Sequence, residues 1–288
     1  MKSTIVSAKW LHKNLKNKDL IILDASQNEN KTNLKSEFEN LQIKNTRFFD
    51  LKNKFSDQHS DMPNMLPNPK DFEKECRKLG INNSSKIVVY DNLGIYTSPR
   101  TWWMFKIMGH INIAVLNGGL PAWKNEGFEL VSFQKKEYQL GNFKATFNPE
   151  MVRNINEIKS NLTTENELVV DARSEGRFNG TAPDPRAGLK SGHIPNSLNL
   201  PYTNVLNKTK FKSKEKLTKI FTSPEEDIDI ELEEHHFPYN FSSESDNRLA
   251  LRYAGLLHKK IKAGVIANTG VLSGKDVVKM LLAGANSV

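Results

Sequence analysis

Two similar apolar runs occur in the sequence, and each ends in Asp-Ala before a polar stretch. They read LIILDAS at residues 20–26 and ELVVDARS at residues 167–174. Short runs of Ile, Leu and Val of this kind are typical of parallel strands that are buried on both faces. A duplicated buried strand predicts two domains of one type, and a chain of 288 residues is long enough for both.

Strands and helices alternate between the two runs. KIVVYDNLG at 86–94 and IAVLNGG at 113–119 predict further buried strands, and SPRTWWMFKIMG at 98–109 predicts a helix that begins near Pro99. This alternation is typical of a parallel sheet that is covered by helices on both faces. Residues 132–150 are polar and lack a helical period, so we expect them to connect the two domains.

The charged residues indicate a solvated surface. The net charge is +8, but the lysines are scattered and are not interleaved with aromatic residues, as a nucleic-acid site would require. No apolar stretch reaches the length of a signal peptide or of a membrane-spanning helix. The sequence therefore predicts a cytoplasmic protein that binds neither nucleic acid nor a membrane.

Cys76 is the only cysteine, which excludes an intramolecular disulfide and a cysteine-rich metal site. It lies in a segment that predicts a helix from Pro69 to Gly80. Phe72, Cys76 and Leu79 fall on one side of that helix and form an apolar stripe. We therefore expect Cys76 to be a small buried hydrophobic residue, because a reactive thiolate needs an electropositive and partly exposed site.

Four long motifs carry a family resemblance. They are MLPNPKDF at 65–72, VVYDNLGIYTSPRTWW at 88–103, VLNGGLPAWKNEGFEL at 115–130 and VVDARSEGRFNGTAPDPRAGLKSGHIPNSLNLPYTNVLN at 169–207. Together they resemble the tandem-domain rhodanese family, which includes thiosulfate and 3-mercaptopyruvate sulfurtransferases. The resemblance extends over residues 1–221. It implies an α/β fold of two rhodanese-type domains, with a noncatalytic first domain at 1–131 and a catalytic domain that begins at 151.

The resemblance also implies a chemistry, which needs no cofactor. In this family a cysteine thiolate takes sulfur from a small anionic donor, holds it as a persulfide and passes it to an acceptor such as a thiol. The loop that carries the cysteine follows a buried strand and points backbone N–H groups inward, at the start of a helix. These groups stabilise the thiolate and the anionic persulfide.

Two arginines match the family's donor-binding segment. The resemblance implies that Arg177 and Arg186 hold the donor's carboxylate or sulfonate by paired hydrogen bonds. The alternative is a structural ion pair with a neighbouring acid, Asp171, Glu175 or Asp184. Arg100 could line the cleft between the domains.

Other conspicuous residues are expected to be structural. Asp171 and Arg173 stand at the end of the second apolar run and are expected to fix the loop that follows. His193 precedes a proline in a turn, and the resemblance implies no role for it as a general base. Trp102 and Trp103 occur at helical spacing, which favours core packing over an aromatic ligand box.

The resemblance stops before the catalytic loop. The family continues with a loop of the form Cys-Gly-Ser-Gly-Val-Thr-Ala, whereas residues 222–288 contain no cysteine. In the first domain Asp91 stands where a cysteine would lie, as is expected of a noncatalytic copy. We therefore expect no catalytic residue and no persulfide, and an incomplete second domain at 151–221.

The last segment resembles a different family. Residues 248–288 are similar to the C-terminal region of a dihydroorotate dehydrogenase-type flavin barrel, which implies a vestigial phosphate-binding turn at Gly270 and Val271. Residues 222–288 are thus expected to be a βα segment of different origin. Three functions stay open: a sulfurtransferase-family protein without its persulfide cysteine, a noncatalytic anion-binding or interaction module, and a fragment of a flavin-binding oxidoreductase.

Overall fold

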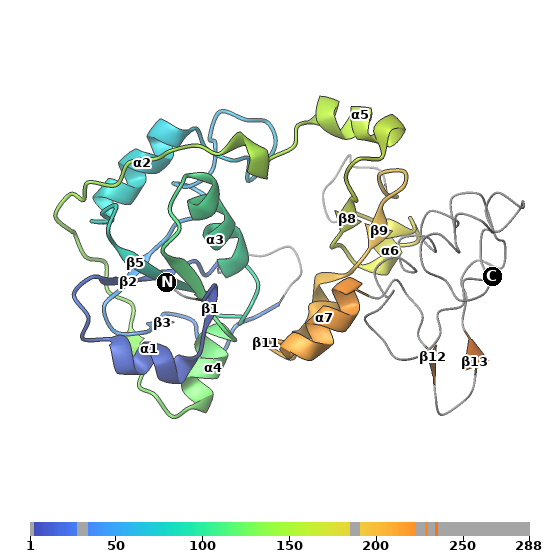
Figure 1. The fold of residues 1–288 in the computed structure, drawn as a ribbon. Coiled ribbons are helices and arrows are strands. Elements are labelled where there is room, and N and C mark those ends of the chain that lie inside the picture. The colour runs from blue at the N-terminus through green and yellow to red at the C-terminus, as the bar shows by residue number, and fades with distance from the viewer. Residues whose placement is uncertain (1–2, 28–33, 185–190, 223–227, 230–233, 236–288) are drawn as a thin grey trace, which may run out of the picture. The chain divides into compact units, whose positions relative to one another are not determined.

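The structure is a computed structural model, and it describes residues 3–27, 34–184, 191–222, 228–229 and 234–235. It divides the chain into two units, residues 1–219 and 220–288 (Figure 1). In the described part of the smaller unit, β12 (Ile228–Asp229) pairs with β13 (Glu234–His235) in antiparallel orientation.

A five-stranded sheet forms the centre of the first domain. Its strands are all parallel and lie in the order β1 (Ile5–Val6), β6 (Ile113–Leu116), β5 (Lys86–Tyr90), β2 (Leu20–Asp24) and β4 (Thr46–Phe48). The predicted strands at 20–26, 86–94 and 113–119 are therefore confirmed. Strands β3 (Leu41–Gln42) and β7 (Val131–Ser132) form a separate antiparallel sheet of two strands.

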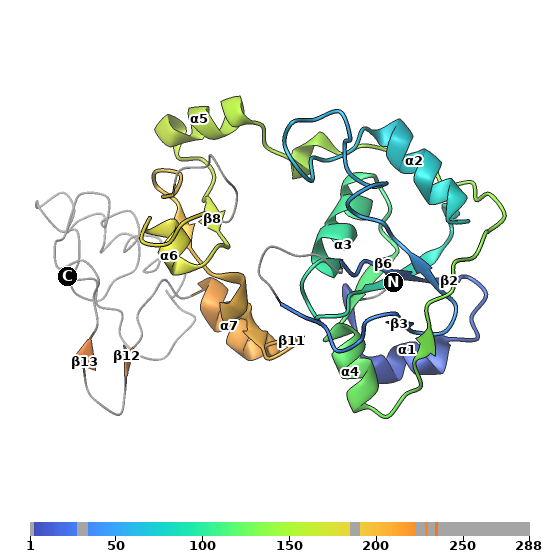
Figure 2. The ribbon, with the colours of Figure 1, turned by 180° about the vertical axis from the view of Figure 1, so that it is seen from behind.

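Helices cover both faces of the sheet, as the alternation predicts. Ile21 and Leu23 belong to the core cluster that contains residues of α2 (Pro69–Lys78) and α3 (Ser98–Ile107). Ile22 belongs to a second cluster with residues of α1 (Ala8–Asn14) and α4 (Gly119–Asn125). Successive residues of a strand point to opposite faces, which explains the division. Helices α1 and α4 lie side by side in Figure 1 and in Figure 2.

Helix α2 begins and ends at the residues that the sequence indicates. Its N-cap is Asn68, whose side chain accepts a hydrogen bond from the backbone N–H of Asp71 at 3.0 Å, and Pro69 follows in the first turn. After the helix, Gly80 has a φ of +65°, and a Cβ there would lie 2.9 Å from a backbone oxygen. Only glycine fits that position without strain.

The segment expected to connect the domains, 132–150, runs along the first domain in extended form. The N–H of Phe143 donates to the carbonyl of Ile81 at 3.0 Å, and the N–H of Thr146 donates to the carbonyl of Met108 at 2.9 Å. The side chain of Phe143 is buried in the cluster beneath α2 and α3. This part of the connector is therefore fixed to the first domain, and the domain boundaries stay a prediction.

The second half contains smaller elements. In chain order they are the 3-10 turn η1 (Pro149–Met151), α5 (Ile155–Thr164), β8 (Val170–Asp171), α6 (Glu175–Phe178), β9 (Leu198–Asn199), η2 (Tyr202–Val205), β10 (Leu206–Asn207), β11 (Lys210–Phe211) and α7 (Lys214–Thr222). Strands β8 and β9 are parallel, and β10 and β11 form a hairpin. Helix α5 begins with a reciprocal capping box between Asn154 and Glu157.

The second apolar run was expected to be a buried strand, and this prediction is wrong for the described part of the chain. Leu168 is 70% exposed, Val170 47% and, on the neighbouring strand, Leu198 55%. The reason is the number of partners. Strand β2 lies between β4 and β5, whereas β8 pairs with β9 alone among the described strands. An apolar run predicts a strand but does not supply the layers that bury it.

The two repeats place an aspartate at the same position in different environments. Burial raises the pKa of Asp24 from 3.8 to about 6, although Ser26 and Tyr90 donate hydrogen bonds to its carboxylate. The hydrogen bonds from Arg173 instead lower the pKa of Asp171. Ser26 and Arg173 occupy equivalent positions, two residues after each aspartate. The direction of the pKa shift differs because Asp24 is buried in the core, whereas Asp171 is less buried and pairs with Arg173.

We expect Asp24→Asn to stabilise the protein at neutral pH. Because the pKa of Asp24 is raised on folding, its favourable contribution is complete below about 3.8 and is lost as pH rises through about 6. A difference of about two pKa units corresponds to about 3 kcal/mol in the free energy of unfolding. Urea unfolding of both proteins at several pH values measures it. A difference between them that does not grow from pH 4 to pH 7 would contradict the assignment.

Candidate active site

The loop after β5 closes around the carboxylate of Asp91. Its Oδ1 accepts the N–H of Leu93 at 3.0 Å, and its Oδ2 accepts the N–H groups of Tyr96, Thr97 and Ser98 at 2.9, 3.0 and 2.9 Å. The hydroxyl of Ser98 donates a further bond of 2.6 Å to Oδ2. The Asp91 side chain is fully buried. Four amides and one hydroxyl thus stabilise one negative charge at the start of α3.

This arrangement matches the anion-stabilising loop that the rhodanese resemblance implies, with a carboxylate oxygen in place of a sulfur atom. Inward-pointing amides at the end of a buried strand stabilise any small anion that is attached at that position. A carboxylate has no nucleophilic sulfur and already satisfies the donors. In the first domain the loop is therefore formed but holds no thiol, as the presence of Asp91 predicts.

Cys76 lies in a different environment, the apolar core. Its side chain is 0% exposed and belongs to the apolar cluster with Phe72 and Ile81. Burial raises the pKa of the thiol well above its usual value, and the charges of Glu75 and Glu73 raise it further. A neutral buried thiol is a poor nucleophile. The prediction that Cys76 is a core residue is confirmed.

Charged residues form a chain at the start of the second domain. Asp171 Oδ2 accepts a hydrogen bond of 2.5 Å from Arg173, and Asp184 Oδ2 accepts one of 2.5 Å from Arg177. A longer contact of 3.9 Å joins Arg173 to Asp184. The predicted role of Asp171 and Arg173 is consistent with these contacts, since Arg173 also donates to the carbonyl of Gly192 at 2.6 Å.

Arg177 is placed at the end of the short helix α6, and its guanidinium is only partly used. Its Nη2 pairs with Asp184, so the alternative of a structural ion pair is observed for this residue. Its Nε is buried and has no hydrogen-bond partner among the described residues. This nitrogen is therefore unused in the structure, and another acceptor would reach it only if the surrounding atoms moved. Arg186, the second predicted arginine, lies outside the described residues.

A cavity of about 590 Å³ lies beside β8. Its lining includes Asp171, Arg173, His193, Ile194 and Ser197. The imidazole Nδ1 of His193 is 2.9 Å from the carbonyl oxygen of Phe178, and the two rings stack at 3.8 Å between centroids. These contacts fix the turn, as expected of a structural histidine. The charged groups at the wall are paired with one another, which makes this cavity a poor anion site on its own.

Arg100 stands in the first turn of α3, directly after the loop that holds Asp91. Its Nη2 donates to the carbonyl of Asn64, its guanidinium lies 5.6 Å from the ring centroid of Trp103, and its Nε is buried without a partner. Burial lowers its pKa. Its predicted place in a cleft between the domains stays a prediction. Trp102 and Trp103 pack against the core cluster, as expected.

The described residues contain no group of three or more His, Cys, Asp or Glu side chains that could hold a metal ion. No helix among them has the length and apolar character needed to span a membrane.

Comparison with known families decides the identity of these domains. The model of the rhodanese-like domain matches residues 7–126 and again residues 154–279. The chain belongs to the rhodanese family. Both rhodanese-type domains that the four motifs implied are therefore matched. The second match continues past residue 221, through most of the segment that we expected to be of different origin.

The rhodanese relatives are sulfurtransferases. The mouse 3-mercaptopyruvate sulfurtransferase is 36% identical over 233 residues, which cover 78% of each chain. The Escherichia coli 3-mercaptopyruvate sulfurtransferase is 34% identical over 219 residues, 75% of this chain and 77% of the relative. The thiosulfate/3-mercaptopyruvate sulfurtransferase 1 of Arabidopsis thaliana, a mitochondrial protein, is 37% identical over 220 residues, and the matched region spans 58% of its length.

Solved structures agree with the fold. The crystal structure of the 3-mercaptopyruvate sulfotransferase SseA from Escherichia coli superimposes with a TM-score of 0.67 at 31% identity, covering 76% of this chain and 83% of that one. The two-domain rhodanese fold is therefore confirmed. The comparisons do not support the resemblance to a flavin barrel. Gly270 and Val271, on which that resemblance depended, lie outside the described residues.

Proposed function

We propose that this chain is a sulfurtransferase-type rhodanese that binds the anionic group of a sulfur donor but does not hold the sulfur. The observation that carries this proposal is Cys76, the single cysteine of the sequence, buried in α2 with a raised pKa. A persulfide needs an accessible thiolate, because the thiolate attacks the donor's sulfur. The relatives support the donor class, which is thiosulfate or 3-mercaptopyruvate.

The proposed donor site is the pair of arginines in the second domain. Arg177 presents a buried Nε that no acceptor uses, and Arg186 follows it with the family's spacing. Paired guanidinium groups suit a carboxylate or a sulfonate. Transfer of sulfur to a thiol acceptor needs a persulfide, so we do not expect this chain to carry out that step.

A purely noncatalytic role in anion binding or in protein interaction is the second candidate. The unpartnered Nε of Arg177 favours it to the same degree, because an anion site needs no thiol. The relatives do not favour it, since the Arabidopsis, mouse and Escherichia coli proteins are named as sulfurtransferases. Binding of a donor without release of sulfide would fit both candidates, so a defined partner protein is needed to prefer the second.

We expect Arg177→Ala to weaken binding of 3-mercaptopyruvate by about tenfold to a hundredfold, the range for loss of a charge-assisted hydrogen bond. Isothermal titration calorimetry with the whole chain measures the dissociation constant. Arg153→Ala is the matched control, because Arg153 is a surface arginine that pairs with Glu167. If Arg177→Ala lowered the unfolding midpoint but left the donor affinity unchanged, its role would be the ion pair with Asp184 alone.

A further inference from the structure

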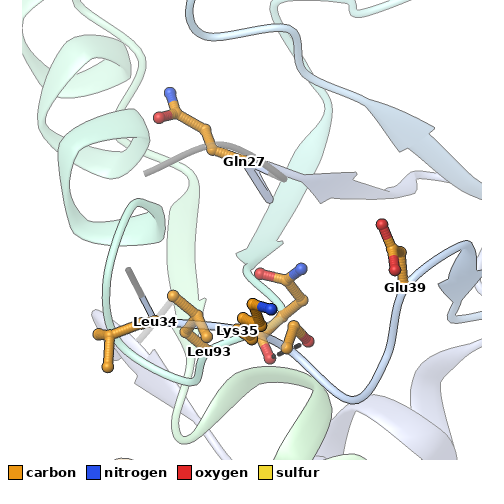
Figure 3. Close-up of a pocket in the computed structure, with 7 residues that line it drawn as sticks. Gln27, Leu34, Lys35, Glu39 and Leu93 are labelled. Carbon is orange, nitrogen blue, oxygen red and sulfur yellow. Dashed lines mark hydrogen bonds between the residues drawn. The ribbon is translucent and has the colours of Figure 1, made fainter. Parts of the chain in front are cut away.

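A hollow of about 280 Å³ lies in the first domain, and its lining includes Gln27, Leu34 and Leu93 (Figure 3). Gln27 and Leu34 are the described residues on either side of residues 28–33, which the structure does not describe. Because the wall of the hollow is described only in part, we assign no ligand to it.

The sequence contains two Asn-Gly pairs, Asn117-Gly118 and Asn179-Gly180. Asparagine is a chemically labile residue, and its deamidation is fastest before glycine, because glycine has no side chain to shield its backbone nitrogen. The reaction also needs a backbone that can rotate until this nitrogen reaches the carbonyl carbon of the asparagine side chain. The surroundings of each pair therefore decide which of the two reacts in the folded chain.

The pair in the first domain is held on several sides. Asn117 follows β6, its N–H donates to the carbonyl of Val6 at 2.9 Å, and its Oδ1 accepts the N–H of Phe211 at 2.9 Å. Gly118 is buried at the start of α4, and a Cβ there would lie only 2.7 Å from the side chain of Lys210. Neither the side-chain amide nor the backbone of this pair has room to rotate.

The pair in the second half of the chain lies in an open turn. Asn179 is the C-cap of α6, a helix of four residues, and both Asn179 and Gly180 are exposed. Neither the side chain of Asn179 nor the N–H of Gly180 makes a hydrogen bond to a described residue. A Cβ at Gly180 would have no described neighbour closer than 3.8 Å beyond the adjacent residues. The turn thus has space for the rotation that deamidation requires.

We propose that Asn179 is a deamidation site of this chain. The backbone nitrogen of Gly180 loses its proton to hydroxide and forms a bond to Cγ of Asn179, and the side-chain nitrogen leaves as ammonia. Water then opens the resulting succinimide ring at one of its two carbonyl carbons. The products are aspartate and isoaspartate. One water is consumed and one ammonia is released, and neither an oxidant nor a reductant takes part.

Deamidation changes the charge at the end of α6. The product carries a carboxylate two residues after Arg177, in place of a neutral amide. A negative charge at a helix C-terminus is unfavourable, because the last carbonyl groups are already partly negative. The carboxylate also lowers the positive potential that an anionic donor meets at Arg177. This effect on binding rests on the proposed donor site, whereas the deamidation itself does not.

Peptide mass spectrometry of the whole chain, incubated at mildly alkaline pH and sampled over time, tests the proposal. We expect the peptide with Asn179 to deamidate at least about tenfold faster than the peptide with Asn117, whose reaction has to wait for local opening. In the chain unfolded in guanidinium chloride the two rates should be similar, because both pairs are Asn-Gly. An unreactive Asn179 in the folded chain, equal rates, or a faster reaction at Asn117 would overturn the proposal.

Two variants measure the effect of the new charge. Asn179→Gln keeps a neutral amide and should not deamidate on the same time scale, because its longer side chain forms the cyclic imide much more slowly. Asn179→Asp carries the charge of the product and should bind 3-mercaptopyruvate about twofold to fivefold more weakly than Asn179→Gln, as expected for an exposed charge. Equal affinities would overturn the effect on binding. Lack of donor binding by the unmodified chain would instead contradict the proposed donor site, and the peptide masses decide the deamidation in either case.

Discussion

In the native chain Cys76 is expected to react with iodoacetamide at least about a thousandfold more slowly than in the chain unfolded in urea. The thiol is 0% exposed and its pKa is raised by burial, so alkylation has to wait for local or global opening. Opening that costs about 4 kcal/mol or more reduces the reactive population at least about a thousandfold. The rate of alkylation is followed by intact mass.

The comparison contains its own control, because the same single thiol is measured in both states. The chain unfolded in urea gives the rate of an unhindered cysteine at the same pH. A native rate within about tenfold of that value would mean that Cys76 is accessible, and the persulfide chemistry would then have a carrier after all.

The loop that holds Asp91 is expected to lower the pKa of a cysteine placed at that position. In an Asp91→Cys, Cys76→Ala chain, the N–H groups of Tyr96, Thr97 and Ser98 would point at a sulfur atom instead of a carboxylate. Thiols at helix N-termini have pKa values of about 3.5 to 7.5, against about 8.5 for a free cysteine. We therefore expect the new thiol to have a pKa at least one unit below the free value.

The ultraviolet absorbance of the thiolate, followed against pH, measures this pKa without requiring the thiol to be accessible. The chain with only Cys76 is the matched control, since its thiol should stay neutral over the same range. Near-ultraviolet circular dichroism establishes that the variant is folded. A folded variant with a thiol pKa of about 8.5 or higher would contradict the view that this loop is built to stabilise an anion.

The first domain could be predicted from its sequence because local signals and tertiary structure agree there. The apolar runs at 20–26 and 86–94 became the central strands β2 and β5, which have a partner on each side. The stripe of Phe72 and Cys76 in α2 was enough to place the only thiol in the core. Each of these features depends on spacing along the chain, which the sequence displays directly.

Other features depend on tertiary contacts, which the spacing of residues along the chain does not indicate. The run that contains Val170 is as apolar as its counterpart, yet β8 is exposed because its described neighbours form only one layer. The motif around Arg177 left open a donor site and an ion pair with Asp171, Glu175 or Asp184, and only the folded chain identifies Asp184 as the partner.

The most direct test is the mass of the intact chain. It is measured after incubation with thiosulfate or with 3-mercaptopyruvate, and again after addition of cyanide or a thiol acceptor. We expect an unchanged mass, with no sulfur atom added to Cys76 and no thiocyanate or sulfide above the rate without protein. Gain of one sulfur atom on Cys76, removed again by the acceptor as product forms, would contradict it.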